Sequence, residues 1–585
     1  MARKFLALMI AASGLALGGQ GLVKAQPPDG AAARVTALAD AYVRDYFDAF
    51  PEQALLNGAE DLHSGQLADH SLPALARWAA REDAMLTQLK GIDAATLTGR
   101  PQEFTYKFLQ NQLESAVAFR SCRIELWDVS PTWTGWQATL AVVAGQQATG
   151  TADQQRSAVA RFSQLPKYLD DEIDNLREGL RLGYTAPKHN VRTVVAQMDA
   201  LLAAPVAESP FVAMAKADST AFRKDLETLE LTRIRPAIKK YRDFLETNYL
   251  PAAREKIGVS ENPGGAACYQ AAIAYHATVK MAPQQVHDLG LAQMAKIEDG
   301  LRAIGRRSFG TENPAALLTL ARTDPKYRFK SREELIKYAE AAVERARLAL
   351  PNAFGRLPKA RVIVEPYPPY LEKSAPGGES ISPTADGKPG KYLINAYKAD
   401  EQNKAGLEST AFHETYPGHQ MQGAIALERN GLHPIQRFFF LSGFGEGWAL
   451  YSERLADELG LFTGDIDRLG QLSEEALRAA RLVVDSGMHA LGWTRAQAVD
   501  YMLAHTASTR DAAEAEIDRY IAVPAQATSY MIGNLEIRRL RDQATATLGA
   551  KFDLRAFHDV VLEDGTLPLW VLRQKVERWV ASQGK

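Results

Sequence analysis

The amino-acid sequence predicts a mainly α-helical protein with a small element of strands and loops near residues 363–397. Two observations lead to this prediction. In long segments the apolar residues recur three and four positions apart, which is the period of an amphipathic helix. The 585-residue chain also has an ordinary globular composition, with 46% hydrophobic and 24% charged residues, unlike disordered, collagenous or coiled-coil proteins.

Helical periodicity is found in six segments, and we expect each of them to form a helix. They are residues 33–50, 154–182, 191–204, 222–248, 284–304 and 332–350. Ser331 and Glu334 predict a capping box at the start of the last helix, and Gly183 predicts the end of the second. We interpret nearly all of these apolar stripes as hydrophobic core.

Proline and glycine interrupt the helical pattern between residues 363 and 397. The stretches VIVEPYPPYL and KYLIN contain β-branched and aromatic residues and predict short strands or extended arms. Between them lies a loop of turn-forming residues, Ser374 to Lys391, whose length indicates a mobile or functional segment. Because this loop precedes the histidine motif described below, we expect it to shape a substrate cleft.

The first 25 residues have the three parts of a secretion signal. Arg3 and Lys4 give a positive start, residues 5–18 form a short apolar run, and residues 23–25 supply the small side chains of a cleavage site. We therefore predict cleavage after Ala25 and a periplasmic or secreted mature protein. The apolar run is too short and too rich in Gly and Ala for a comfortable membrane span, so we expect no stable membrane insertion.

The charge balance excludes one class of partner. Without residues 1–25, which hold three basic residues and no acidic one, the chain has 65 basic and 70 acidic residues. A mildly acidic chain without a basic run gives no reason to expect a nucleic acid as partner.

Cys122 and Cys268 are the only two cysteines. In an oxidising compartment they can form a disulfide, but their positions in the sequence do not show whether they are close in space. Both outcomes are open at this point. Two cysteines cannot build a thiolate-rich zinc site, so a metal in this protein would use histidines and carboxylates.

Residues 411–422 read AFHETYPGHQMQ and hold two histidines, His413 and His419. In zinc-hydrolase helices two histidines four positions apart share one face, because four steps of about 100° nearly complete a turn. Here the separation is six positions, so a straight helix would point the two imidazoles in different directions. Pro417 and Gly418 permit an irregular backbone. We therefore predict a locally distorted helix that brings His419 back toward His413.

Glu414 directly follows His413 and would point away from a metal that His413 binds. We therefore predict Glu414 as the general base, which takes a proton from metal-activated water and passes it to the leaving amine. An isolated His-Glu pair is more often an ordinary surface or core pair. A His-Glu pair followed by Pro-Gly-His within seven residues is more specific, and it favours the metal site.

A carboxylate would complete a catalytic site with two histidines and one position left for water. The segment GFGEGWALYSERLADELG offers Glu446 and Glu453, seven positions apart and on roughly the same helix face. Either could bind. We prefer Glu446 as the ligand and Glu453 as a partner that orients an imidazole. An ion pair with a nearby arginine is the equally weighted alternative for Glu453.

Stabilisation of an oxyanion requires a hydrogen-bond donor near the reacting carbonyl. Tyr530 and His489 are the downstream candidates for catalysis, and Tyr520 and Gln526 are candidates for substrate binding in the cleft. A tyrosine or histidine among apolar residues is more often a hydrogen-bonded core residue. These four assignments therefore depend on the resemblance described next.

Several separated motifs resemble those of a bacterial family of unknown function, DUF885. They are HETYPGHQMQ, EGWALYSERL, DSGMHALGWTRAQAVDYM, PAQATSYMIGNLEIRRLRDQA and FDLRAFHDVVLEDGTLPLWVL, in this order along the chain. The similarity extends from about Tyr46 to the C-terminus and covers nearly the whole mature chain.

More distantly, the sequence is similar to the helical gluzincin metallopeptidases, which include carboxypeptidase Taq and angiotensin-converting enzyme. This resemblance implies a zincin-like helical fold around a deep substrate cleft. Residues 26–585 would form one metallopeptidase-like domain, either as a single body or as two lobes flanking the cleft. The zinc ligands would be His413, His419 and Glu446, and the general base would be Glu414.

The segment SYMIGN is similar to a tyrosine-bearing segment of carboxypeptidase Taq, which supports Tyr530 as an oxyanion or substrate contact. The sequence departs from those peptidases in its His-to-His spacing, which is two residues longer.

The leading hypothesis from the sequence is a zinc-dependent hydrolase that cleaves peptides or small protein fragments. One alternative is a zinc hydrolase of a non-peptide amide or ester, with the same site and a different pocket. The other is a catalytically inactive helical binding protein. The four residues His413, Glu414, His419 and Glu446 argue against the last, because a binding protein has no evident need for the adjacent base.

Overall fold

The computed structural model describes residues 30–59, 61–216, 218–368, 372, 376–384 and 387–583. The predicted signal peptide and parts of the predicted loop from Ser374 to Lys391 lie outside these residues. The described residues form a mainly α-helical fold with one small three-stranded sheet, which confirms the predicted fold class. Among them, no helix combines the length and the hydropathy that a membrane span requires.

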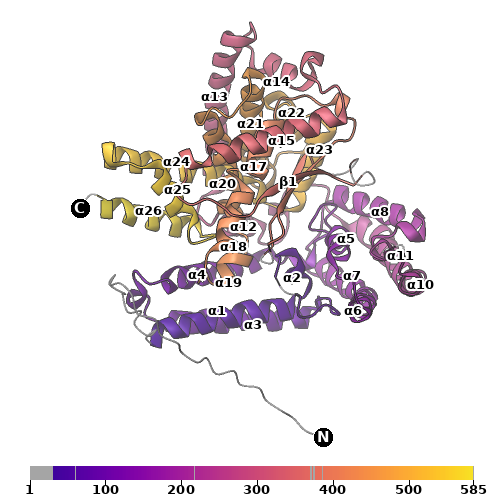
Figure 1. Ribbon diagram of the computed structural model, residues 1–585. Coiled ribbons are helices and arrows are strands. Elements are labelled where there is room, and N and C mark those ends of the chain that lie inside the picture. Colours follow the sequence, from indigo (N-terminus) through magenta and orange to yellow (C-terminus); the bar gives the residue numbers. More distant parts are fainter. Residues whose placement is uncertain are drawn as a thin grey trace.

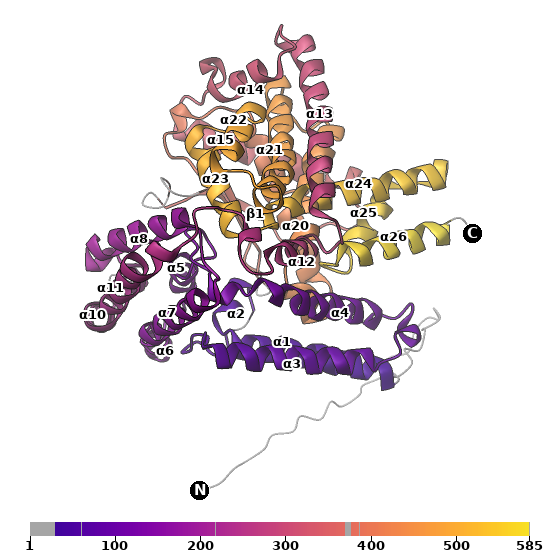
Figure 2. The ribbon, with the colours of Figure 1, turned by 180° about the vertical axis from the view of Figure 1, so that it is seen from behind.

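The N-terminal half of the chain folds into two groups of helices. The first group consists of α1 (Gly30–Ala49), α2 (Glu52–Leu56), α3 (Leu72–Lys90) and α4 (Gln102–Phe119). The second consists of α5 (Trp136–Gln146), α6 (Ala152–Phe162), α7 (Leu165–Leu182), α8 (Lys188–Ala203), α9 (Pro210–Ala213), α10 (Thr220–Leu229) and α11 (Arg235–Phe244). In Figures 1 and 2 the indigo α1, α3 and α4 run beside one another, and the magenta second group lies at one end of them.

The rest of the chain forms the larger part of the molecule, above α1 and α4 in Figure 1. It begins with α12 (Gly265–Ala277), α13 (Pro283–Ser308), α14 (Pro314–Thr323) and α15 (Arg332–Ala349), followed by β1 (Val362–Pro366), β2 (Gly378–Ile381) and β3 (Gly390–Ile394). It continues with α17 (Leu407–Glu414), α18 (His419–Glu428), α19 (Pro434–Phe438), α20 (Ser442–Glu458), α21 (Asp465–Ala490), α22 (Arg495–His505), α23 (Arg510–Ala522), α24 (Ser529–Leu548), α25 (Leu554–Leu562) and α26 (Leu569–Gln583).

Buried apolar residues form one large cluster and two smaller clusters. The large cluster joins α1, α3 and α4 to α12 and the helices that follow it. The second cluster lies among α5 to α11 and the segments beside them, with Trp136, Tyr241 and Tyr249 among its side chains, and the third joins α6, α9 and α10. All the candidate functional residues belong to helices of the large cluster or to segments between them.

The six predicted helices are confirmed, and two of them are divided. Residues 154–182 form α6 and α7, because Pro166 suits the first turn of a new helix better than the interior of a long one. Residues 222–248 form α10 and α11 with a π-helical turn before Pro236. Gly183 ends α7 with a φ of 82°, in the left-handed region.

The predicted capping box of α15 is half confirmed. The Ser331 hydroxyl accepts a hydrogen bond from the Glu334 amide, as expected for an N-cap. The Glu334 carboxylate, however, accepts from the amide of Lys330 rather than from that of Ser331. The helix start is therefore stabilised by both side chains, but through a backbone group one residue earlier.

The sheet has the strand order β1-β3-β2, with β1 parallel and β2 antiparallel to β3. The predicted strands VIVEP and KYLIN correspond to β1 and β3, whereas β2 lies within the predicted loop. Its sequence, GESI, has too few apolar residues to stand out as a strand. The Gln420 side chain of α18 donates hydrogen bonds to the carbonyls of Ile381 and Lys391, so the sheet is fixed to the helix that carries His419.

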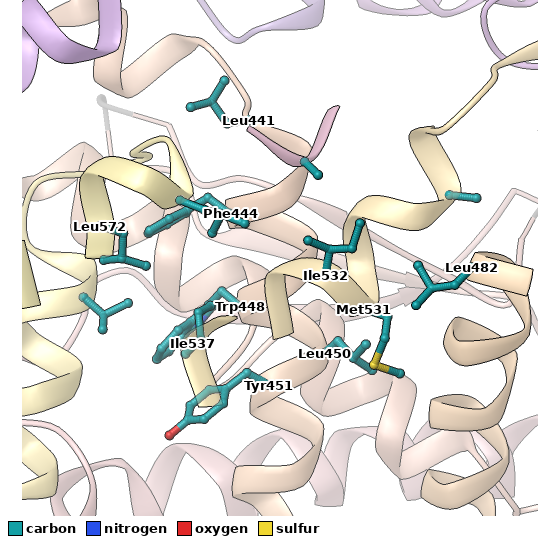
Figure 3. Packing of buried hydrophobic residues seen from close by; sticks show 14 of the residues in the cluster. Leu441, Phe444, Trp448, Leu450, Tyr451, Leu482, Met531, Ile532, Ile537 and Leu572 are labelled. Atoms are coloured by element: carbon teal, nitrogen blue, oxygen red, sulfur yellow. The ribbon is translucent and has the colours of Figure 1, made fainter. Parts of the chain in front are cut away.

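Helices α20 and α24 cross closely, with buried side chains around Trp448 filling the contact (Figure 3). A Cβ atom at Gly533 would overlap the carbonyl oxygen of Gly443, so glycine is required at this crossing. The close approach holds α20, which carries Glu446, against α24, which carries Tyr530.

The structure decides the question that the two cysteines left open. Cys122 and Cys268 form a disulfide, and their Cα atoms are 4.4 Å apart. The bond links the end of the α4 region to α12, across 146 positions of sequence.

Candidate metal centre

The helix that carries the histidine motif is interrupted rather than merely distorted. Helix α17 ends at Glu414 and α18 begins at His419, with a cis peptide bond between Tyr416 and Pro417. A Cβ atom at Gly418 would overlap the carbonyl oxygen of His413, so only glycine permits the chain to fold back so tightly. The break places His413 in the last turn of one helix and His419 at the start of the next.

Two hydrogen bonds hold the turn between the two helices, one to α17 and one from α20. The amide of Gly418 donates to the carbonyl of Phe412 at 3.1 Å. The indole N–H of Trp448, on α20, donates to the carbonyl of Pro417 at 2.8 Å. Because Trp448 is fully buried, this contact fixes the turn to the helix that supplies the third candidate ligand.

His413, His419 and Glu446 converge. The Nε2 atoms of His413 and His419 lie 3.6 Å and 3.4 Å from the same carboxylate oxygen, Oε2 of Glu446. The two imidazole rings are nearly perpendicular, with centroids 4.9 Å apart. Ligand atoms held about 2.0–2.1 Å from a tetrahedral zinc ion are roughly 3.3 Å from one another. The donor set and its spacing therefore fit a zinc ion bound by two imidazoles and one carboxylate.

Glu453 lies behind His413, two turns along α20 from Glu446. Its Oε1 accepts a hydrogen bond from His413 Nδ1 at 2.8 Å, and its Oε2 accepts from the Ser409 hydroxyl at 2.6 Å. With Nδ1 carrying the proton, Nε2 of His413 presents its lone pair toward Glu446. The guanidinium of Arg478 is 3.9 Å from Glu453, so both interpretations weighed for this residue describe real contacts.

The electrostatic surroundings favour a cation between the three residues. Burial lowers the pKa of His413, but the carboxylates of Glu446 and Glu453 raise it, to about 9. Burial raises the pKa of Glu446, and the two histidines more than reverse this effect, so its pKa is lowered. A buried carboxylate held in its charged form beside imidazole nitrogens attracts positive charge, either as a proton or as a metal ion.

Glu414 lies close enough to the three residues to interact with their charges. Its burial raises its pKa, and the charges of His413 and His419 act in the opposite direction. This carboxyl group is thus adjacent to the candidate ligands without being one of the three groups that converge.

Tyr530 lies between the candidate ligands and a group of arginines. The guanidinium of Arg481 stacks on its ring, 4.4 Å from the ring centroid. Burial and the charge of Glu446 raise the pKa of Tyr530, while the charges of the arginines lower it. Its phenol is therefore in a position to interact with both sides of the site.

The structure brings the other candidates to different places. Both ring nitrogens of His489 are bonded to the backbone: Nδ1 accepts from the Val259 amide at 3.1 Å, and Nε2 donates to the Tyr520 carbonyl at 2.9 Å. His489 is fully buried, and burial lowers its pKa to about 4. This arrangement assigns His489 to the core, since neither nitrogen is left for a substrate.

Tyr520 and Gln526 contact the arginines rather than the three converging residues. The Tyr520 hydroxyl accepts from Arg481 Nε at 2.8 Å, and the ring is fully buried. The side-chain amide oxygen of Gln526 accepts a hydrogen bond from Arg519 at 2.9 Å. These contacts support both side chains as parts of the wall behind Tyr530.

Two features near the site were missed from the sequence. Phe440 is 54% exposed, with its ring 6.4 Å from that of His419. Arg478 and Arg481 are buried on α21, although arginines are rarely buried. Their place among the apolar residues of ALRAARLVVDSGM was the available signal, because charged residues on a core-facing helix surface require partners.

Two hollows on the molecule lie elsewhere. One of about 310 Å³ is lined by residues including Glu401, Glu474 and Ser508, and one of about 480 Å³ by residues including Asp45 and Trp78. Neither is lined by a candidate ligand, so the deep substrate cleft implied by the gluzincin resemblance stays a prediction.

The comparisons with known proteins agree with the fold. A protein from Colwellia psychrerythraea, described as a lipoprotein, has a crystal structure that matches 94% of this chain and 99% of its own, with a TM-score of 0.88 and 26% identity. A protein from Shewanella oneidensis, described as a lipoprotein of unknown function, matches 92% of this chain and 99% of its own, with a TM-score of 0.71 and 20% identity. No curated protein sequence matches. The family model described as "Bacterial protein of unknown function (DUF885)" matches residues 51–576, and the chain therefore belongs to the DUF885 family.

Proposed function

We propose that this protein is a zinc-dependent hydrolase that cleaves peptides. The observation that carries the proposal is the convergence of His413, His419 and Glu446, whose ligand atoms all lie within 4.8 Å of one another. Glu453 supports it, because a carboxylate that fixes an imidazole is the usual partner of a metal-binding histidine. Glu414 supports it further, because a carboxylate beside such a site is suited to be the base.

A zinc ion at this site would be held by His413, His419 and Glu446 and would supply a water of lowered pKa. Glu414 would serve as the base that takes up a proton and passes it to the leaving amine of the substrate. The phenol of Tyr530, whose pKa is raised by burial, stays protonated and donates a hydrogen bond to the oxyanion that develops on the substrate. The mostly buried surroundings strengthen both interactions.

We also propose that the protein acts outside the cytoplasm. The first 25 residues have the composition of a secretion signal. The Cys122–Cys268 disulfide is of the kind that persists in oxidising compartments. Two structural relatives are described as lipoproteins.

The test begins with metal analysis of the purified mature protein and with digestion of a mixed peptide library before and after chelation. We expect about one zinc ion per chain and cleavage that the chelator abolishes. Glu414→Gln should keep the zinc and lose about 10²–10⁴-fold in kcat, whereas His419→Ala should lose the zinc. Zinc binding with cleavage of small amides or esters but no peptides would favour the non-peptide hydrolase. A protein with no zinc and no cleavage would favour the binding protein.

A further inference from the structure

A cluster of two buried arginines and one half-buried arginine adjoins the candidate metal centre. It consists of Arg478 and Arg481 on α21 and Arg519 on α23, and we call it the arginine cluster. Arg478 is 8% exposed and Arg481 is 6% exposed. Three guanidinium groups gathered within a core require an account of where their hydrogen bonds go.

Each guanidinium is only partly satisfied by the protein. Arg481 donates from Nε to the Tyr520 hydroxyl at 2.8 Å and from one terminal nitrogen to Glu516 at 3.0 Å. Arg519 donates to Gln526 at 2.9 Å and to the same oxygen of Glu516 at 3.1 Å.

Buried N–H groups are left over in all three side chains. Nη1 of Arg481 is buried without a hydrogen-bond partner, and so are Nε of Arg478 and Nε of Arg519. An unsatisfied buried donor on a charged group is among the more costly features that a folded protein can keep. The two unpaired positions of Arg481 Nη1 are the strongest case, because this nitrogen lies at the end of a side chain that is already held by two partners.

The acidic groups around the cluster do not remove this surplus of donors. Glu516 accepts from Arg481, Arg519 and the hydroxyl of Tyr520. Glu474 pairs with Arg478, and Glu453 is shared between Arg478 and His413.

Two contacts connect the arginine cluster to the candidate metal centre. Arg478 lies 3.9 Å from Glu453, which is hydrogen-bonded to His413. Arg481 stacks on the ring of Tyr530, and Tyr530 interacts with the charge of Glu446. The arginine cluster and the candidate ligands thus share Glu453 and Tyr530 as neighbours.

We propose that the arginine cluster binds a carboxylate of the substrate, with Arg481 as the main donor. The proposal rests on the hydrolase function proposed above and narrows its substrates to peptides that carry a carboxylate close to the bond that is cleaved. Arginine presents its N–H groups in a planar fork that matches a carboxylate, which makes it suitable for such a site. The carboxylate is either the C-terminus of the peptide or an acidic side chain near it, and the same donors fit both.

The test uses peptide pairs on the full-length mature protein with zinc bound. One pair of N-acetylated pools differs only in having a free C-terminal carboxylate or a C-terminal amide. A second pair differs in having glutamate or glutamine at the positions near the C-terminus. We expect loss of the relevant carboxylate to lower kcat/KM by roughly 10- to 150-fold for each charged hydrogen bond that disappears. The pair that responds identifies the source of the carboxylate.

Variants connect the effect to the arginine cluster. Arg481→Gln should bring the ratio of the kcat/KM values within the responding peptide pair close to one, with unchanged zinc content. Arg481→Lys should keep only part of the wild-type ratio, because lysine lacks the planar fork of N–H groups. Arg538→Gln is the matched control, since Arg538 on α24 pairs with the buried Glu475 outside the arginine cluster. It should leave the ratio as in the wild type.

A binding measurement keeps the result independent of turnover and of the variant's folding. The Glu414→Gln protein, which keeps Arg481, is titrated in a calorimeter with N-acetyl-trialanine and with its C-terminal amide, and with N-acetylated peptides containing glutamate or glutamine. Tighter binding of the carboxylate peptide than of its uncharged counterpart supports the inference even when no cleavage is found.

Equal cleavage and equal binding within both pairs would overturn the inference while leaving the hydrolase intact. A protein that binds the carboxylate forms selectively but cleaves nothing with zinc bound would instead overturn the proposed function.

Discussion

His413 and His489 are both buried histidines of the same large core, but their ring nitrogens have different partners. In His489 both nitrogens are bonded to backbone groups of the surrounding core. In His413 one nitrogen is held by Glu453, and the other lies 3.6 Å from a carboxylate that a second histidine also approaches. The difference teaches that burial does not mark a functional histidine. His413 is a candidate because its ring nitrogen is held among other potential ligand atoms.

The carboxylates make the same distinction electrostatically. Burial lowers the pKa of His489 to about 4, so this ring is neutral near pH 7. His413 is equally buried, yet Glu446 and Glu453 raise its pKa to about 9. One environment is built for an uncharged ring, and the other is built to hold positive charge.

The largest expected effect separates the two histidines by metal content. His413→Ala should reduce zinc affinity by more than the roughly 10–100-fold that loss of an outer partner costs, because a direct ligand is removed. His489→Ala should retain the zinc. Metal analysis after dialysis checks both variants, each serving as the control for the other. Equal zinc in the two variants would contradict the comparison.

The next effect concerns the stability of the fold, and here His489 rather than His413 is the residue whose replacement should matter. His489→Ala removes two buried hydrogen bonds and leaves a cavity, so we expect the free energy of unfolding to fall by ~3 kcal/mol. The backbone groups of Val259 and Tyr520 would be left without their partner. Denaturant unfolding of the metal-free proteins measures this change. A wild-type midpoint for His489→Ala would show that its two hydrogen bonds contribute nothing.

A smaller change sharpens the contrast by altering only the support of His413. Glu453→Gln keeps the size of the side chain but weakens its hold on the imidazole, and it should lower zinc affinity about 10–100-fold. Glu475→Gln is the control, since Glu475 is also buried but pairs with Arg454 and Arg538 instead. Competition with a chelator gives both affinities, and equal values would remove Glu453 from the site.

The last effect concerns pH dependence in the core near His489. Burial raises the pKa of Asp485 to about 7, although the carboxylate accepts hydrogen bonds from the Tyr269 hydroxyl and the Ala525 amide. Between about pH 4 and 7 the folded protein thus binds a proton at Asp485 that the unfolded chain has released, and this contribution to stability is lost as the pH rises.

Asp485→Asn should therefore show a weaker loss of stability over that range, by up to about 1.4 kcal/mol per pH unit. Denaturant midpoints of variant and wild type at several pH values provide the measurement. Parallel curves for the two proteins would mean that Asp485 does not titrate in this window.

Local patterns predicted much of this structure, and the failures have a common cause. The helices and β1 and β3 follow from periodicity and from residue type, which are properties of short segments. The convergence of the three candidate ligands could also be predicted, because Pro417 and Gly418 between the histidines indicate a break in the helix. The choice of Glu446 over Glu453 agrees with the geometry, since Glu446 is the one that meets both rings.

Features that depend on distant partners could not be predicted in the same way. His489 and Tyr530 lie in motifs of similar appearance in the sequence. Only the fold shows that the ring of His489 is hydrogen-bonded to backbone groups of Val259 and Tyr520. Strand β2 forms because β3 offers it an edge, and its own four residues do not require a strand. The arginine cluster arises from two helices whose sequences are separated by α22.

The disulfide has a consequence for how the molecule is put together. Cys122 and Cys268 both belong to the large cluster, and the bond joins them covalently across 146 positions of sequence. The segment between them, which includes α5 to α11, is therefore a loop of the chain that the disulfide closes. Opening or rearrangement of these helices can therefore proceed without separating the end of α4 from α12, which the bond holds together.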